Sequence, residues 1–340
     1  MSSMIYYPAT MTCTESGLKE HWYCSACGKY FLDADHTQET TLENLPSPAL
    51  GHNLSIVNGK AHCDRCGKDF DAVAIDDKPV LLNCENNSYF LDKLELKYGH
   101  SYFAWTEFTA KDFSYTFPYY PNVWNSWFVP FEITTDELGV NGLGFTAAYI
   151  AGVRQYEKDA EGNVITQVDV IKIKNGKLRA GTPYLIKLES SATEPLKATL
   201  NKTGAILKSS DVNNIHTETA TAKYDFIGTY NEIAEEDVKL CYYIIGSKGT
   251  FVHPSSPVYA MNWYMKITDK GAVYDELSSP SQAKAFIINV IGEEDQTTGI
   301  RTLYPAEKQI KEVYDLSGRR LDAPKRGQVN IINGKKIFVK

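Results

Sequence analysis

The amino-acid sequence predicts a mainly β protein: a small Cys/His knuckle module, an antiparallel β-sandwich-like body and a C-terminal β-hairpin tail. The chain of 340 residues contains 22 tyrosines, and tyrosine, threonine, valine and isoleucine favour strands. Short apolar and aromatic runs alternate with turn-forming residues about every ten residues, which is typical of sandwiches and barrels. Five of the seven cysteines lie near the N-terminus. We therefore divide the chain into a module at 1–75, a body at 76–295 and a tail at 296–340.

The N-terminal module contains two CxxC turns, each followed by Gly-Lys and then an aromatic residue. Cys24 and Cys27 belong to the first turn, and Cys63 and Cys66 to the second. Two thiolates separated by two residues can reach one ion, and the glycine that follows relieves crowding in the turn. Zinc takes four such ligands tetrahedrally in a closed structural site. The sequence therefore predicts a structural Zn²⁺ ion held by these four thiolates.

Other ligand sets are open, because the segment between the two turns is longer than the usual zinc-ribbon gap. Cys13 precedes the first turn, and His52 and His62 precede the second. A set of Cys13, Cys24, Cys27 and His52 is one alternative.

Disulfides are a further alternative for this module. In an exported protein Cys13 could pair with Cys24 or Cys27, and Cys63 with Cys66. A redox site is a third alternative, although a redox CxxC expects a βαβ setting that this polar, turn-rich stretch lacks. In each case we expect a structural role, because a segment with few aliphatic residues buries too little surface to be stable without a staple.

The body is predicted to consist of strands and turns. Residues 113–117 alternate aromatic and small polar side chains with a period of two, which indicates a half-buried strand. Residues 148–158 and 164–174 are expected to form two strands of a meander. Asn175-Gly176 then predicts a type I′ hairpin into the run at 177–188.

A few shorter signals complete this prediction. Residues 242–245 and 250–252 are expected to form another hairpin, and the tail is expected to form a hairpin through Asn333-Gly334. Only 134–138 and 231–237 are predicted to be briefly helical.

The sequence contains no recognisable catalytic set. It has no P-loop, GxGxxG, GxSxG or HExxH motif. The three histidines outside the N-terminal module, His100, His216 and His253, have no nucleophile or carboxylate at a telling spacing. We therefore expect a protein that is not an enzyme. An unrecognised hydrolase stays an alternative, because catalytic groups meet in space and not in sequence.

Composition restricts the partners. A net charge of −7 argues against nucleic-acid binding. No run of about 20 apolar residues occurs, so no transmembrane helix is expected.

The aromatic stretch at 115–128 is a candidate ligand platform. Tyr119, Trp124 and Trp127 lie in it, and exposed aromatic faces can stack on the apolar faces of sugars. The alternative is that these side chains fill the core of a tyrosine-rich sandwich.

The knuckle module resembles a repeat of large bacterial surface proteins. The residues that carry the resemblance are Cys-Thr-Glu-Ser-Gly at 13–17, the run containing the first CxxC turn at 22–33, and Pro-Ala-Leu-Gly-His at 48–52. They are similar to a repeat of leucine-rich-repeat surface proteins of Bacteroidetes and Firmicutes. The second unit departs from it, because residues 53–61 have no counterpart of Cys13. The resemblance implies an extracellular module without a catalytic residue.

The body and the tail resemble parts of exported Bacteroidetes proteins. Trp-Phe-Val-Pro-Phe at 127–131 and Ala-Gly-Thr-Pro-Tyr-Leu-Ile-Lys at 180–187 are similar to a β-rich domain of such proteins. Val-Tyr-Asp-Leu-Ser-Gly-Arg-Arg at 313–320 and the Asn-Gly-Lys-Lys that follows at 333–336 closely resemble their C-terminal β-tail. This implies export to the cell surface or the medium, although the first residues show no signal peptide.

From these resemblances we expect a non-enzymatic exported surface protein with an adhesion, display or binding role. Its partner would be a host or cell-surface glycan or protein. Glycan binding through the stretch at 115–128 is the alternative function.

Overall fold

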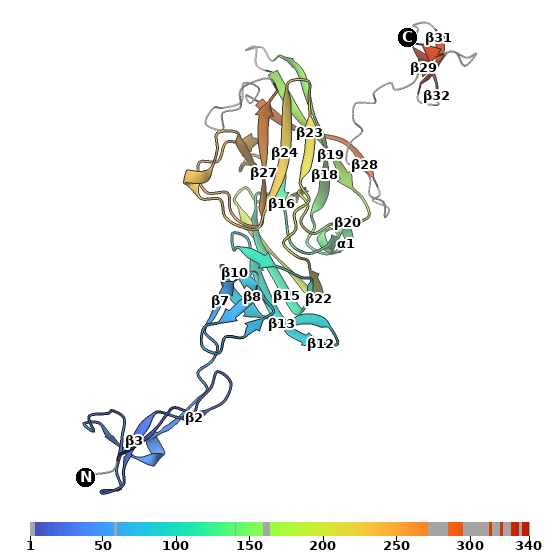
Figure 1. Cartoon of the computed structure of the whole chain (residues 1–340). Helices are drawn as coiled ribbons and strands as arrows, with labels where there is room; N and C mark the ends of the chain where they lie inside the picture. Colours follow the sequence, from blue (N-terminus) through green and yellow to red (C-terminus); the bar gives the residue numbers. More distant parts are fainter. Residues whose placement is uncertain are drawn as a thin grey trace.

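The computed structural model describes residues 4–57, 60–139, 141–158, 164–270 and 285–294, together with four short strands near the C-terminus (Figure 1). Strands dominate these residues, and helix is confined to a few short segments. The predicted mainly β fold class is therefore confirmed.

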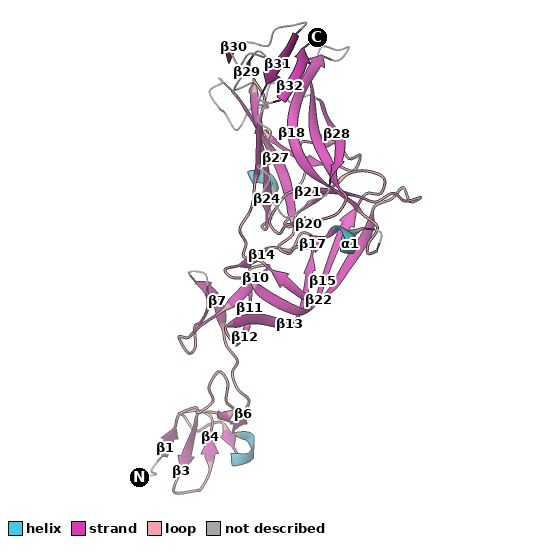
Figure 2. Ribbon diagram, turned by 90° about the vertical axis from the view of Figure 1, so that its right-hand side faces the viewer, coloured by secondary structure: helices cyan, strands magenta, loops and turns pink. Residues whose placement is uncertain are grey.

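The N-terminal unit is a small sheet with two loops attached. Its four strands are, in spatial order, β1 (Met4–Tyr7), β3 (His21–Cys24), β4 (Tyr30–Phe31) and β5 (Glu39–Thr40). A separate two-stranded ladder joins β2 (Gly17–Leu18) to β6 (Pro46–Ser47), and a 3₁₀ turn, η1, covers Leu42–Asn44. Figures 1 and 2 both place this unit at one end of an elongated molecule.

A second knuckle follows the first unit. It is a three-stranded sheet in the order β7 (Leu54–Val57), β8 (Lys60–Cys63) and β9 (Asp69–Phe70). This sheet lies against the body, because β7 contacts β11 (Lys78–Leu81) and the Leu82 amide donates to the Asp71 carbonyl at 2.9 Å.

Neither knuckle has a hydrophobic core of its own. Within the described part of residues 4–71, the buried side chains are His21, Cys24, Leu45, Ala61 and Cys63. The large apolar cluster of the molecule begins only at Val73. As expected from the sequence, this segment lacks the buried apolar area that a domain needs to be stable by itself.

Two sheets form the part of the body next to the second knuckle. One has the order β11, β10 (Ala72–Ile75) and β14 (Tyr102–Ala104). The other has the order β12 (Asn83–Glu85), β13 (Ser88–Lys97), β15 (Phe108–Tyr119) and β22 (Leu196–Leu207), with β13 parallel to β15. Since β10 pairs with β14, residues 72–75 belong to the body sheet, so the boundary that we placed at 75 falls within it.

Two five-stranded sheets form the rest of the body. One has the order β16 (Asn125–Trp127), β21 (Tyr184–Lys187), β18 (Thr146–Lys158), β19 (Val164–Ile173) and β28 (Ala285–Glu294). The other has the order β23 (Ile215–Glu218), β24 (Ala222–Thr229), β27 (Asn262–Asp269), β25 (Tyr242–Ile245) and β26 (Phe251–Val252).

These two sheets pack face to face, as Figure 1 shows. The buried Trp263 donates its indole N–H to the Tyr184 carbonyl of the opposite sheet at 2.8 Å. The rings of Phe251 and Phe286 meet across the layers, with centroids 5.8 Å apart. The sandwich-like body is mostly antiparallel, and its parallel pairs among the described strands are β13 with β15 and β19 with β28.

The predicted hairpin at Asn175-Gly176 is wrong. β19 pairs with β18 and β28, whereas the next strand, β20 (Lys177–Leu178), pairs with β17 (Ile133–Thr134). The turn is bound to another segment, since the Thr135 amide donates to the Gly176 carbonyl at 2.9 Å and the Gly176 amide donates to Thr135 Oγ1 at 3.1 Å. The chain therefore leaves the sheet here instead of folding back along β19.

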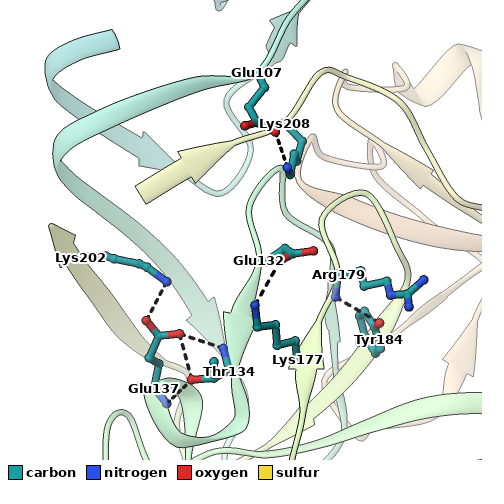
Figure 3. Close-up of polar contacts among 9 residues, drawn as sticks. All are labelled: Glu107, Glu132, Thr134, Glu137, Lys177, Arg179, Tyr184, Lys202 and Lys208. Atoms are coloured by element: carbon teal, nitrogen blue, oxygen red, sulfur yellow. Dashed lines mark hydrogen bonds and ion pairs between the residues drawn. The ribbon is translucent and has the colours of Figure 1, made fainter. Parts of the chain in front are cut away.

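Helix α1 (Thr135–Leu138) lies where a helical segment is predicted, and a capping box begins it (Figure 3). The Glu137 amide donates to Thr134 Oγ1 at 3.2 Å, and the Thr134 amide donates to Glu137 Oε2 at 2.8 Å. Lys202 on β22 forms an ion pair with Glu137 at 2.7 Å and so ties α1 to the neighbouring sheet.

Other short elements also agree with the sequence. A 3₁₀ turn, η2 (Glu235–Asp237), lies within the second segment predicted to be helical, and β25 pairs antiparallel with β26 as expected. In the tail, the described strands are β29 (Val313–Tyr314), β30 (Arg320–Leu321), β31 (Gln328–Ile332) and β32 (Lys335–Val339). The antiparallel pairing of β31 with β32 confirms the hairpin predicted there.

Candidate metal centre

Four metal-ligating side chains converge in the described part of the chain. They are Cys13, His52, Cys63 and Cys66, and their ligand atoms all lie within 4.8 Å of one another. The Sγ atoms of Cys13 and Cys63 are 3.9 Å apart, and Cys66 Sγ lies 3.6 Å from His52 Nδ1. Tetrahedral zinc, with bonds of about 2.3 Å to sulfur and about 2.0 Å to nitrogen, would place such pairs roughly 3.8 Å and 3.6 Å apart.

The two cysteines of the second knuckle come from the turn between β8 and β9. Cys63 ends β8 and is fully buried, whereas Cys66 is exposed. The Cys63 amide donates to the Lys68 carbonyl at 2.9 Å and the Gly67 amide donates to the Cys63 carbonyl at 2.8 Å. Gly67 has a φ of 68°, which glycine adopts without strain. This turn holds both thiols on one side.

Cys13 is presented by a tight loop between β1 and β2. The Leu18 amide donates to Thr10 Oγ1 at 2.8 Å, and the Glu15 amide donates to Thr12 Oγ1 at 3.0 Å. Gly17 closes the loop, because a Cβ there would lie 2.4 Å from the backbone nitrogen of Met11. No larger residue fits at this position without moving the loop.

His52 is placed by a second loop that binds the first. The Leu50 amide donates to the Thr12 carbonyl at 2.9 Å, and the Gly51 amide donates to the Cys13 carbonyl at 3.0 Å. These bonds hold the Pro-Ala-Leu-Gly-His segment beside the Cys13 loop. The ring of His52 also contacts Phe70 of β9, with centroids 4.5 Å apart.

Hydrogen bonds also join the two units next to the ligands. Arg65, inside the second CxxC turn, donates to the carbonyls of Leu50 and Gly51 at 2.6 and 2.9 Å. The Asp64 amide donates to the Asn53 carbonyl at 3.0 Å. The centre is therefore a joint, where two loops of the first unit meet the turn of the second knuckle.

The surroundings of this centre shift the pKa values of the Cys63 and Cys13 thiols in opposite directions. Burial raises the pKa of the Cys63 thiol, but hydrogen bonds from the Cys66 amide, the His52 side chain and the Arg65 amide outweigh it and lower this pKa to about 5. Burial and hydrogen bonds to Cys63 and Cys66 raise the pKa of Cys13 to about 11. The Cys63 thiolate therefore forms readily and disfavours ionisation of Cys13, and a bound divalent cation would remove that repulsion.

The two CxxC turns do not share one site, so the predicted set of four cysteines is wrong. Cys63 and Cys66 belong to the centre, but Cys24 and Cys27 do not, and the alternates Cys13 and His52 take their places. The reason is topological, because hydrogen bonds hold the Cys13 and His52 loops to each other and to Arg65 of the second CxxC turn.

The geometry also decides against the remaining ligand sets and the disulfides. His62 lies outside the centre and bonds to Asp69 at 2.7 Å. The mixed set that includes Cys24 and Cys27 does not assemble. All seven cysteines are free, and the Cys13–Cys63 distance of 3.9 Å is far longer than a disulfide bond of about 2.05 Å.

Two of the three residues of the candidate sugar platform, Tyr119 and Trp127, are buried in the core. Tyr119 and Trp127 are only 6% and 3% exposed and lie in the core, where Trp127 packs edge-on against Phe117 at 5.0 Å. Trp124 is partly buried and packs against the same core. On β15, Tyr115, Phe117 and Tyr119 alternate with less buried residues so that their rings fill the core, whereas Tyr120, which follows the strand, is 38% exposed.

No protein-family model, curated protein or solved structure matches this chain. Among the described residues, none of the helices has the length and apolar character needed to span a bilayer.

Proposed function

We propose that the protein is a non-enzymatic exported surface protein in which a structural Zn²⁺ ion locks the N-terminal unit to the body. One observation carries this proposal: two ligands come from the first unit, Cys13 and His52, and two from the second knuckle, Cys63 and Cys66. A metal so bound fixes the angle between two units that have no apolar core to hold them together.

The ligand set favours zinc over other cations. Three thiols and one imidazole are the ligands of a common structural zinc site. Oxygen ligands would be needed for calcium or magnesium. All four coordination positions are filled by protein, which leaves no open position for water or substrate and supports a structural rather than a catalytic ion.

The surface role rests on the segments that resemble those of exported Bacteroidetes proteins, at 13–52, 127–187 and 313–336. A rigid joint suits such a role, because it holds the terminal unit away from the body and in a fixed direction. The N-terminal unit would then be displayed for adhesion or binding. Fractionation of the native cells tests this part, and recovery of the protein from the cytosol would contradict it.

Zinc retention tests the joint directly. Protein purified without chelator and desalted should retain at least about one equivalent of zinc by elemental analysis. The variants Cys13→Ser and Cys63→Ser should each lose the zinc of the joint, because three ligands hold it far less tightly than four.

A matched control is available on the same chain. Cys84 is exposed on β12 and belongs to no ligand group among the described residues. Cys84→Ser should retain as much zinc as the unmodified chain. Equal zinc in Cys13→Ser and Cys84→Ser would reject the joint.

A further inference from the structure

The first CxxC turn has the same backbone as the turn that carries two of the metal ligands. The Cys24 amide donates to the Lys29 carbonyl at 2.9 Å and the Gly28 amide donates to the Cys24 carbonyl at 2.8 Å. The second knuckle makes the same two bonds, at the same lengths, from Cys63 and Gly67. Gly28 and Gly67 also share the left-handed conformation, with φ of 71° and 68°.

The strands around the two turns correspond as well. β3 pairs with β1 and β4 in the first unit as β8 pairs with β7 and β9 in the second. Cys24 lies opposite Met4 at the end of its strand, and Cys63 lies opposite Leu54. Cys24 is buried and Cys27 is exposed, the same burial as Cys63 and Cys66.

The two turns differ in the sequence that precedes them. His52 lies two residues before Leu54, but the residue two places before Met4 is Ser2, and serine is not a usual zinc ligand. Within the described residues, no third Cys, His, Asp or Glu ligand joins Cys24 and Cys27 in a metal-binding group. The Cys13 and His52 loops of the chain are already held at the second knuckle.

We propose that Cys24 and Cys27 are the open half of a second zinc site, which is completed by a Cys/His loop pair of another module of this type. This inference rests on the proposed function, because the joint at Cys13, His52, Cys63 and Cys66 is its template. The incoming loops would correspond to residues 10–18 and 48–52, supplying one thiolate and one imidazole. Modules would then be connected in series by zinc, each knuckle receiving the loops of the module before it, as the second knuckle receives those of the first unit.

The surface beside the open turn suits such a partner. Ile5, Tyr6 and Tyr7 on β1 are 40%, 50% and 43% exposed, an apolar edge on a unit that has little apolar interior. Exposed apolar patches of this kind mark protein contact sites.

The open turn lacks one contact of the closed joint. Ala26 occupies the position of Arg65, whose guanidinium binds two carbonyls of the incoming loop. We therefore expect the second joint to be weaker than the first.

Cobalt binding to the full chain tests the open half-site without a partner. The unmodified protein should bind a second, weaker equivalent of Co²⁺ with thiolate-to-cobalt absorption, for about two equivalents in total. The variant Cys24→Ser/Cys27→Ser should lose the weaker equivalent and retain the tight one. Identical titrations for the two proteins, or a Cys24–Cys27 disulfide in protein isolated without oxidant, would overturn the proposal.

A second experiment tests the partner. A donor copy with Cys24, Cys27, Cys63 and Cys66 all changed to serine retains Cys13 and His52 with no knuckle to bind them. Its two loops still bind each other through the Leu50–Thr12 and Gly51–Cys13 hydrogen bonds, so the ligand pair stays assembled. With Zn²⁺, this donor should form a 1:1 complex with the unmodified chain in analytical ultracentrifugation, and a chelator should dissociate it.

The acceptor variant Cys24→Ser/Cys27→Ser is the control and should form no complex. A complex that persists with this acceptor, or no complex with the unmodified chain, would overturn the proposal. Failure of the joint itself looks different, because the tight metal equivalent would then be missing from every variant, including Cys24→Ser/Cys27→Ser.

Discussion

At the scale of single residues, the metal centre depends on positions that hold no metal. Gly17 lies four residues after Cys13, where a Cβ would collide with the backbone of Thr10 and Met11. Thr10 and Thr12 use their hydroxyls to accept amide hydrogen bonds within the same loop. Groups that orient a ligand in this way commonly change metal affinity by about 10–100-fold when they are lost.

We expect Gly17→Ala to weaken zinc binding at the joint by about 10-fold or more, because the loop must shift and carries Cys13 with it. A competition titration with a chromophoric chelator measures this affinity. Gly292→Ala is the matched control, since Gly292 has open space around its Cβ position and no left-handed φ. Equal affinities for the two variants would show that the loop does not position Cys13.

At the scale of elements, a short helix shows how polar groups hold a segment in place beside the core, in which its Leu138 is buried. α1 has only four residues, which is too short to be stable by propensity. The capping box of Thr134 and Glu137 satisfies its first amides, and Lys202 adds an ion pair from β22 (Figure 3).

The capping box gives a prediction for stability. We expect Thr134→Ala to lower the free energy of unfolding by about 1 kcal/mol, because the Glu137 amide loses its acceptor at the start of the helix. Urea unfolding monitored by tryptophan fluorescence measures the difference. Thr193→Ala, at an exposed position outside the strands and helices, should change the stability little. A loss of the same size in both variants would mean that the missing cap does not cause the loss of stability.

At the scale of the whole molecule, the body has an apolar core, whereas the first unit and the second knuckle have none. The apolar core runs from Val73 to Phe286, whereas the first unit and the second knuckle contribute nothing to it. The orientation of the N-terminal unit therefore depends on the joint, through its four ligands and a few hydrogen bonds.

Removing the metal should free the first unit without unfolding the body. After chelation, small-angle scattering should give a broader distance distribution, while the melting temperature of the body stays nearly unchanged. The variant Cys13→Ser should show the broad distribution with or without chelator. If the chelator also lowered the melting temperature of the body clearly, the metal would support the core as well as the joint.

The sequence by itself determined the local strand pattern and the residue types of the N-terminal module. The alternation of aromatic and small polar residues at 113–117 predicted a half-buried strand, and β15 buries Phe113, Tyr115 and Phe117. The CxxC turns and the lack of aliphatic residues predicted a stapled module of Cys and His ligands. These features could be predicted because they depend on local backbone preferences and on the chemistry of single side chains.

Only the tertiary structure decided which ligands meet and which aromatic faces are free. Cys13 and His52 reach Cys63 and Cys66 because two loops bind each other and the next unit, a contact between segments far apart in sequence. The same applies to Trp127, which the packing of β16 against β15 buries in the core. The spacing of two cysteines along the chain determines which two metal ligands one turn can supply. The other two ligands depend on how whole units dock.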